Sequence, residues 1–406
     1  MSEIHILPNG LRVVHMRVPG NNVGHFGFAI KAGSGDETDP REHGLAHFVE
    51  HTLFKGTLKR SSWHILNRME AVGGELNAFT TKADTVVYTA FPKGSLVRAV
   101  DLLVDLVLNS QFPSFELEKE RQVIRDEINS YLDSAADAVY DDFEDLLYRD
   151  TPLGHNILGT HETVANISRD MCLGWLKRHY TAANMVAFYA GNLSLESFIR
   201  KAEPLLMLVP PTASPSARTV FAPPSSPFAE SRSISVHQSH TVLGTALSEL
   251  DMQERIALAL TVNIIGGPGM NSLLNLEVRE RRGLVYSIES AVSSWPGSTM
   301  VTTYFGCDPE DTPKCMRLVR EQFERVADGY INSRRLMAAK KQYRGQMLLA
   351  RENIENRIMG IARAVLHHGR ALTLAESEAM LSAVSNADVA AFADALKNFS
   401  SLTLRP

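Results

Sequence analysis

Two histidines and a glutamate stand close together in the segment His47-Phe48-Val49-Glu50-His51. If this segment is helical, His47 and His51 project from one face, one turn apart. Two nitrogen ligands of one tetrahedral zinc ion need that separation. Glu50 lies on the same side but offset, where its carboxylate can take a proton from a water molecule activated by the metal. The segment therefore predicts a hydrolytic zinc site.

A catalytic zinc site also needs a third protein ligand, and the helix expected at residues 114–132 offers two candidates. Glu120 and Glu127 are seven residues apart, about two turns, and so share one helix face. Three residues with large apolar groups are expected on that inward-pointing face: Val123, Ile124 and Tyr131. Carboxylates on such a face are unfavourable unless they are paired or bind a metal. We expect one of the two to bind zinc and the other to hydrogen-bond a ligand histidine.

The other histidines are interpreted as structural or solvent-facing. His43 also stands four residues before His47, but choosing it as a ligand leaves no glutamate suitably placed as the base. The remaining histidines, including the pair His367-His368, are interpreted as structural.

The order of the helices and strands that must position these residues predicts two similar halves. In the first, strands are expected near residues 26–30, 75–81, 85–91 and 185–190, with helices around the histidine motif and at 63–72, 93–109 and 114–132. In the second, a helix at 252–265, a glycine-rich turn, a helix through Arg282, strands at 284–292 and 299–305, and four further helices are expected. Strands that pair with sequence neighbours, beside grouped helices, predict an α+β fold with a mainly antiparallel sheet in each half.

A stretch rich in Pro, Ser and Ala separates these halves and is typical of a linker. We predict a zinc-binding catalytic domain at residues 1–210, a linker at 211–230 and a related domain at 231–406. In the second half the segment that corresponds to the histidine motif, near residues 258–265, holds no His or Glu. Only the first half is therefore expected to bind metal.

Bulk composition sets outer limits on the function. A chain of 406 residues exceeds what one hydrophobic core usually organises. Its net charge of −5, spread along the sequence, argues against nucleic acid or an anionic membrane as a main partner. The first ten residues lack the pattern of a signal peptide, and no apolar stretch of about 18 residues predicts a membrane span. Three cysteines, an odd and sparse set, favour a reducing compartment, so a cytoplasmic location is expected.

Beyond the motif itself, a long series of segments resembles the pitrilysin family of inverted-motif zinc peptidases, which includes insulin-degrading enzyme and the mitochondrial processing peptidase. The motif lies within Gly44–His51 and is followed by Phe54-Lys55-Gly56-Thr57. Similar segments are Pro8–Leu11, Ala32–Ser34, Gly73–Ala78, Glu120–Glu127, Pro152–Gly154, Ile157–Gly159, Asn184-Met185, Gly191-Asn192 and, in the second half, Arg279–Ser287. The resemblance covers most of the chain and is closest to the short two-domain members.

The resemblance implies a role for individual residues. By the family pattern Glu127 is the third ligand of one zinc ion per chain, and Glu120 supports the site from behind. Asn77 and Ala78 fall on an edge strand that would pair with the substrate backbone. Tyr286 would donate to the developing oxyanion, and Arg279 would orient the substrate and the tyrosine.

The resemblance also implies an assembly and an activity. Short family members take the arginine–tyrosine pair from a partner subunit, and this chain has both the zinc motif and the pair. We therefore expect a homodimer with active sites completed in trans. The implied activity is an endopeptidase acting on peptides or small unfolded polypeptides, with Glu50 as general base. The alternatives are a peptidase dedicated to removing a leader from one precursor and, in a different class, a non-catalytic scaffold subunit.

Overall fold

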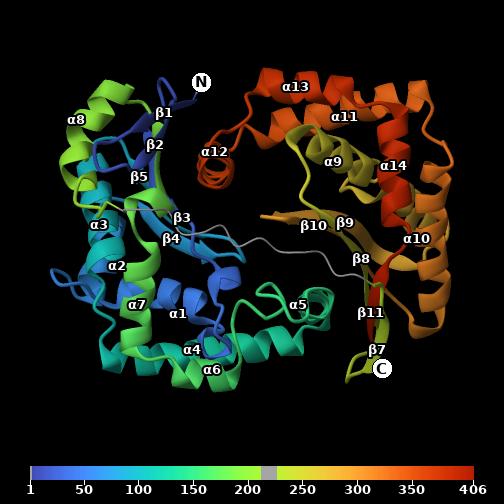
Figure 1. The fold of residues 1–406 in the computed structure, drawn as a ribbon, viewed down its shortest axis with the longest axis horizontal. Coiled ribbons are helices and arrows are strands. Elements are labelled where there is room, and N and C mark those ends of the chain that lie inside the picture. Colours follow the sequence, from blue (N-terminus) through green and yellow to red (C-terminus); the bar gives the residue numbers. More distant parts are fainter. Residues whose placement is uncertain (1, 212–225) are drawn as a thin grey trace. The chain divides into compact units, whose positions relative to one another are not determined.

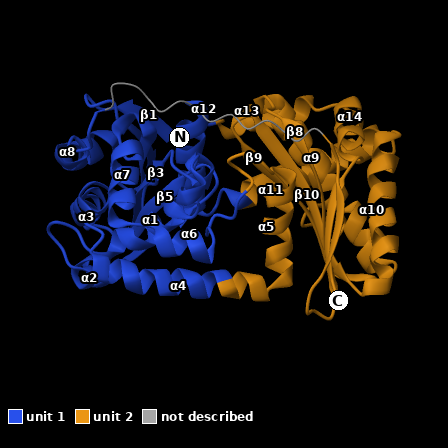
Figure 2. Ribbon diagram, turned by 60° about the horizontal axis from the view of Figure 1, so that its bottom comes forward, with its two compact units in different colours: residues 1–128, 155–219, 350–371 blue, residues 129–154, 220–349, 372–406 orange. Residues whose placement is uncertain are grey.

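The computed structural model describes residues 2–211 and 226–406, which form two compact units (Figure 1, Figure 2). Unit 1 takes the described residues within 1–128, 155–219 and 350–371. Unit 2 takes those within 129–154, 220–349 and 372–406. None of the described helices combines the length and the apolar character that a bilayer span requires.

Unit 1 is built on a six-stranded sheet with the order β1-β2-β6-β3-β5-β4. Its strands are β1 (Ser2–Ile6), β2 (Arg12–Arg17), β3 (Val23–Ile30), β4 (Glu75–Thr80), β5 (Thr85–Pro92) and β6 (Met185–Gly191). Neighbours run antiparallel except β2 and β6, which are parallel. Strand β4 therefore ends the sheet and has β5 as its only neighbour among the described strands.

Helices cover both faces of this sheet because the apolar residues of its central strands alternate between two cores. Val13 belongs to the larger core and Val14 to the smaller one, and Val87 and Val86 divide in the same way. The larger core is completed by α1 (Leu45–Thr52), α2 (Ser62–Glu70), α3 (Leu96–Asn109), α4 (Ser114–Asp133), α6 (His161–Asn166), α7 (Arg169–His179) and α8 (Leu195–Leu206). The smaller core is completed by α12 (Ile354–His368). Short 3-10 turns η1 (Ser34–Asp36), η2 (Pro40–Glu42), η3 (Leu53–Lys55) and η4 (Ala182–Asn184) connect these elements.

Unit 2 is built on a five-stranded sheet with the order β7-β11-β8-β10-β9, in which only β7 and β11 are parallel. Its strands are β7 (Ala229–Ser233), β8 (Ser239–Ser248), β9 (Val285–Trp295), β10 (Ser298–Cys307) and β11 (Ser400–Arg405). Its helices are α5 (Ala135–Leu147), α9 (Met252–Gly266), α10 (Thr312–Ala327), α11 (Ser333–Ala350), α13 (Leu374–Ala383) and α14 (Asn386–Leu396). A π-helical turn, η5 (Asn275–Glu280), and a 3-10 turn, η6 (Pro309–Asp311), complete the unit.

The two sheets repeat one topology. In unit 1, five of the strands follow one another in the order β4, β5, β3, β6 and β2. The last two, β6 and β2, run parallel. In unit 2 the strands β9, β10, β8, β11 and β7 follow the same order and directions. The α+β class with mainly antiparallel sheets is thereby confirmed.

Several details differ from the sequence prediction. Five α-helices, not four, follow β10, and the chain ends in a further strand, β11. The compact units also differ from the predicted ranges 1–210 and 231–406, because α5 belongs to unit 2 and α12 to unit 1. An amphipathic helix signals that it covers an apolar surface, but its pattern does not specify which sheet provides it. Most of the predicted linker, 211–230, lies outside the described residues.

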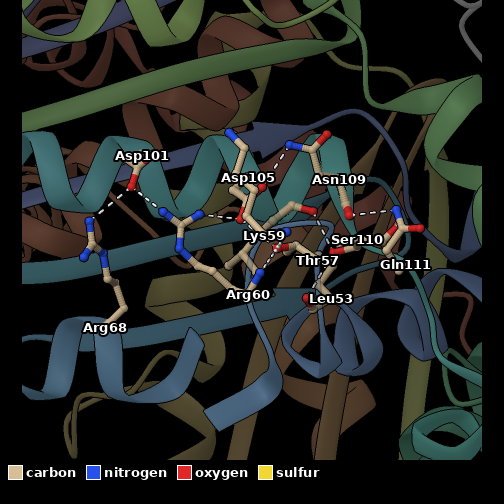
Figure 3. A network of polar contacts seen from close by, with 11 residues as sticks. Leu53, Thr57, Lys59, Arg60, Arg68, Asp101, Asp105, Asn109, Ser110 and Gln111 are labelled. Atoms are coloured by element: carbon tan, nitrogen blue, oxygen red, sulfur yellow. Dashed lines mark hydrogen bonds and ion pairs between the residues drawn. The ribbon is translucent and has the colours of Figure 1, made fainter. Parts of the chain in front are cut away.

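A buried polar network fastens the loop after α1 to helix α3 (Figure 3). Asp105 of α3 is 2% exposed and accepts hydrogen bonds from Thr57 at 2.7 Å and Asn109 at 2.9 Å. Arg60 forms ion pairs with Asp105 and with Asp101. Since only the 3-10 turn η3 separates this loop from α1, the network fixes the chain just beyond the C-terminal end of the helix that carries the histidine motif.

Replacing Asp105 by Ala is expected to destabilise the protein by about 3–5 kcal/mol, because it leaves the largely buried Arg60 without the more deeply buried of its two charge partners. Chemical unfolding monitored by circular dichroism measures the change. Asp101→Ala is the matched control, since the Asp101 side chain is 28% exposed and its loss is better compensated by water. Equal effects of the two substitutions would contradict the importance assigned to burial.

Candidate metal centre

Three side chains of unit 1 converge in the arrangement that a metal ion requires. His47, His51 and Glu127 each offer a ligand atom, and these atoms all lie within 4.8 Å of one another. The Glu127 Oε2 atom is 3.7 Å from His47 Nε2 and 3.6 Å from His51 Nε2. These gaps are too long for hydrogen bonds, whereas ligands about 2.0–2.2 Å from a tetrahedral ion lie about 3.3–3.6 Å apart. The donor set and its spacing therefore fit zinc.

The two histidines are placed by helix α1 and the glutamate by α4. The rings of His47 and His51 lie one turn apart with their centroids 4.4 Å from each other, as the four-residue spacing predicts. Burial, followed by the neighbouring His51, lowers the pKa of His47 to about 3. The neutral imidazole needed for a metal ligand is thus favoured at His47.

Glu120 supports His51 from the side away from Glu127. Its Oε1 atom is 3.1 Å from His51 Nδ1, and its Oε2 atom forms an ion pair with Lys55 Nζ at 2.7 Å. Burial lowers the pKa of His51, but the hydrogen bond that its ring donates to Glu120 and the charges of Glu50 and Glu127 outweigh this effect, so the net pKa is raised. This geometry separates the two glutamates, because Glu127 faces both histidines and Glu120 contacts only His51.

The inward face of α4 is narrower than predicted. Ile124 is fully buried, but Val123 and Tyr131 are 49% and 41% exposed, contrary to expectation. Val123 lies off the stripe formed by Glu120, Ile124 and Glu127, and α4 leaves unit 1 after Ile128. The long helix thus has an inward face only over part of its length.

Glu50 lies beside these ligands and is almost buried, with 8% of its surface exposed. Thr80 of β4 donates a hydrogen bond from Oγ1 to Glu50 Oε2 at 3.1 Å. Burial raises the pKa of Glu50, against the opposing effects of His51 and Thr80. A carboxylate with a raised pKa holds a captured proton more readily, as a general base that later acts as an acid must.

Glu37, which the sequence analysis did not single out, anchors the N-terminus of α1. The residue before this helix is Gly44, at φ +90°, where an added Cβ would meet the Leu158 carbonyl oxygen at 2.7 Å. A glycine has no side chain to satisfy the free N–H groups of the first turn. The Glu37 carboxylate instead accepts hydrogen bonds from the N–H groups of Gly44, at 2.9 Å, and Ala46, at 2.7 Å. The missing capping residue before the histidine motif was the available sequence signal.

A histidine completes the environment of this carboxylate. His155 Nε2 lies 2.8 Å from Glu37 Oε2, and its ring stacks on His43 with centroids 3.7 Å apart. Burial and then the charges of His43 and Lys82 lower the pKa of His155 to about 3, so this ring is neutral. Burial raises the pKa of Glu37, and the two helix N–H groups oppose that shift. His43 therefore lies against this capping cluster, outside the group of metal-ligand atoms.

Replacing Glu37 by Gln is expected to weaken metal binding roughly 10–100-fold, because one acceptor for the first turn of α1 is lost and His47 loses its fixed position. Competition with a chromogenic chelator measures the affinity. Glu42→Gln is the control, since Glu42 contacts Arg178 at 2.8 Å in the same loop and does not cap the helix. An unchanged affinity in the Glu37 variant would contradict the capping role.

Asn77 and Ala78 lie on β4, the terminal strand of the unit 1 sheet. They pair with Tyr88 and Val87 of β5. The opposite edge of β4 has no neighbouring strand within the described part of the chain. Such an edge can accept an extended peptide as an additional strand, so the predicted binding role stays compatible with the fold.

Arg279 and Tyr286 lie in unit 2, on the π-helical turn η5 and on β9. Arg279 has a distant contact with Glu280, 3.9 Å between Nε and Oε1. Tyr286 is 87% exposed on the terminal strand of its sheet. A tyrosine with so little packing has no evident role in the stability of the unit, and its predicted catalytic role stays a prediction.

The fold and this site define a class of protein, the metallopeptidases built from two α+β units. Residues 12–161 match the family model described as insulinase (peptidase family M16), and residues 166–343 match the peptidase M16 inactive domain. The chain belongs to the M16 peptidase family. The match to an inactive domain agrees with the absence of metal-binding residues from the segment of the second half that corresponds to the histidine motif. That segment, 258–265, holds no His or Glu.

Relatives and solved structures extend over nearly the whole chain. An uncharacterized zinc protease of Streptomyces coelicolor is 32% identical, covering 95% of this chain and 85% of the relative. The uncharacterized zinc protease YmxG of Bacillus subtilis is also 32% identical, covering 95% and 93%. The fold matches an M16 inactive-domain structure from Pseudomonas fluorescens (TM-score 0.89, 18% identity, 100% and 98% covered) and a protease from Helicobacter pylori (TM-score 0.89, 19% identity, 100% and 99% covered).

Proposed function

We propose that this chain is a zinc-dependent endopeptidase that hydrolyses peptides or small unfolded polypeptides. The observation that carries the proposal is the convergence of His47, His51 and Glu127 on one point, with the buried carboxylate of Glu50 beside them. A single zinc ion per chain follows, because the described residues of the second half hold no corresponding set. The similar zinc proteases of Streptomyces coelicolor and Bacillus subtilis support the choice of metal.

Each residue of the site has one task in the reaction. His47, His51 and Glu127 would hold the zinc ion, which when bound polarises the peptide carbonyl and lowers the pKa of water to about 7. Glu50 takes one proton from the attacking water and afterwards delivers it to the nitrogen of the departing amine. Glu120 keeps the ring of His51 in its ligand orientation throughout.

Substrate would bind in an extended conformation along β4. Consecutive strand residues point their backbone groups to opposite edges, so one of Asn77 and Ala78 would offer its N–H and C=O to the substrate, on the strand that also carries Thr80 beside Glu50. Pairing through the backbone gives affinity without demanding particular side chains. It requires an unfolded segment, which favours peptides and unfolded polypeptides over folded proteins.

Arg279 and Tyr286 are proposed to complete the active site of a partner subunit in a homodimer, with Tyr286 donating to the oxyanion. Glu50→Gln and Tyr286→Phe chains would then each be nearly inactive alone. Mixing them by reversible unfolding should restore about one quarter of wild-type activity, since half of the dimers are mixed and each holds one intact site. No restoration in a mixture shown to exchange subunits would contradict completion in trans.

The alternative is a peptidase dedicated to removing a leader from one precursor. A mixture of unrelated peptides, analysed by mass spectrometry after incubation, separates the two. Cleavage of many members supports general peptide hydrolysis, and cleavage of almost none supports a dedicated precursor.

We place the enzyme in the cytoplasm, because its three cysteines are all free and buried.

A further inference from the structure

The general base is held by a side chain from a different element. Glu50 belongs to α1, whereas the hydroxyl that contacts its Oε2 atom, at 3.1 Å, belongs to Thr80 of β4. The contact bridges the helix that carries the ligand histidines and the strand proposed to bind the substrate. A shift of Thr80 would therefore move the base relative to the peptide.

A second hydroxyl determines which way Thr80 donates. Thr85 of β5 is fully buried and donates its own proton to the Ala32 carbonyl oxygen at 2.7 Å. Its Oγ1 atom lies 3.3 Å from Thr80 Oγ1 and can only accept there. The Thr80 proton thus has two acceptors, and the Glu50 carboxylate is the nearer one and, when ionised, the stronger one.

The hairpin turn between these two threonines is itself fixed. Asp84 is fully buried, accepts from Thr81 Oγ1 at 3.0 Å, and pairs with Arg363 at 2.9 Å and His367 at 2.7 Å. The last two residues come from α12, so a helix about 280 positions along the chain secures the turn. Two threonines flanking a secured turn have little freedom to move, which is what a precise orienting contact needs.

We propose that Thr80 is a positioning residue for Glu50, and that Thr85 supports it. The Thr80 hydroxyl engages Oε2 and leaves Oε1 to receive the proton from water. The same proton then leaves from Oε1 to the amine nitrogen, while the Thr80 proton stays on Thr80. The inference rests on the proposed function, since it assigns Thr80 a task in the reaction of Glu50.

Thr80→Val in the full-length chain tests the proposal, because valine keeps the shape of threonine and removes the hydroxyl. We expect kcat to fall about 10–100-fold while KM and zinc content stay near wild type. Thr80→Ser, which keeps the hydroxyl, should recover most of the rate. Wild-type kcat in the valine variant, an equal loss in the serine variant, or loss of zinc from the valine variant would each overturn the proposal.

A second readout does not depend on activity. In the metal-free protein, Thr80→Val should lower Tm strongly when Glu50 is present and only slightly in a Glu50→Ala background. The reason is that the effects of substitutions at two contacting residues do not add. Additive shifts would overturn the contact. A wild-type chain that binds zinc and cuts no peptide would contradict the proposed function and the role of Thr80 with it. An active wild type with an unaffected valine variant overturns the role of Thr80 alone.

Discussion

Replacing Glu50 by Gln is expected to lower kcat by about 10²–10⁴-fold while the protein retains about one zinc per chain. Glutamine has the size of glutamate and can still accept from Thr80, but it cannot take a proton from water. Since Glu50 is no part of the ligand set, metal binding should be little affected. Steady-state kinetics on a fluorogenic peptide, together with metal analysis of the same sample, measure both quantities.

The matched control for this substitution is Glu42→Gln, which changes the same functional group in a contact with Arg178. We expect near-wild-type kinetics from it. A Glu50→Gln variant that turns over peptide at the wild-type rate would refute the assignment of the base. Simultaneous loss of zinc would instead place Glu50 among the ligands.

Removing a ligand carboxylate should have a second large effect, on metal affinity. Glu127→Ala is expected to lower zinc affinity by more than about 100-fold, and Glu120→Gln by about 10–100-fold, because only Glu127 faces both histidines. A chelator competition titration gives both values. A larger loss from Glu120→Gln would exchange the roles of the two glutamates.

The same titration should depend on pH. Because the net effect of Glu120, Glu50 and Glu127 raises the pKa of His51, zinc must displace a proton from that ring more often than from an ordinary histidine. Apparent affinity in wild type is therefore expected to fall as the pH is lowered. In Glu120→Gln, which removes the leading cause of the raised pKa, that fall should begin at a lower pH.

The residues that carry local chemistry could be predicted from the sequence. The four-residue spacing of His47 and His51 determines their common face once a helix forms. The seven-residue spacing of Glu120 and Glu127 limits the third ligand to two candidates. The spacing could not separate these two, because the choice depends on where α4 lies relative to α1. The observed distances separate them geometrically.

Contacts made by distant segments were beyond sequence reasoning. Glu37 and Thr80 reach the site through hydrogen bonds from a loop and a strand, and neither type of residue is unusual in its local sequence. Helix α12 has an ordinary amphipathic pattern, which does not reveal that it covers the unit 1 sheet. The repeated topology, by contrast, agrees with the two similar halves that the order of elements predicted from the sequence.

The most direct test of a catalytic zinc ion at His47, His51 and Glu127 measures peptidase activity and metal content together. Both are followed through chelation and the return of zinc. The purified chain is incubated with a quenched fluorescent peptide before treatment, after dialysis against a chelator, and after addition of one equivalent of zinc. A catalytic zinc site predicts about one zinc per chain, loss of cleavage when the metal is removed, and recovery when it is returned. Cleavage that persists in the metal-free protein, or a chain that binds no zinc at His47, His51 and Glu127, would contradict it.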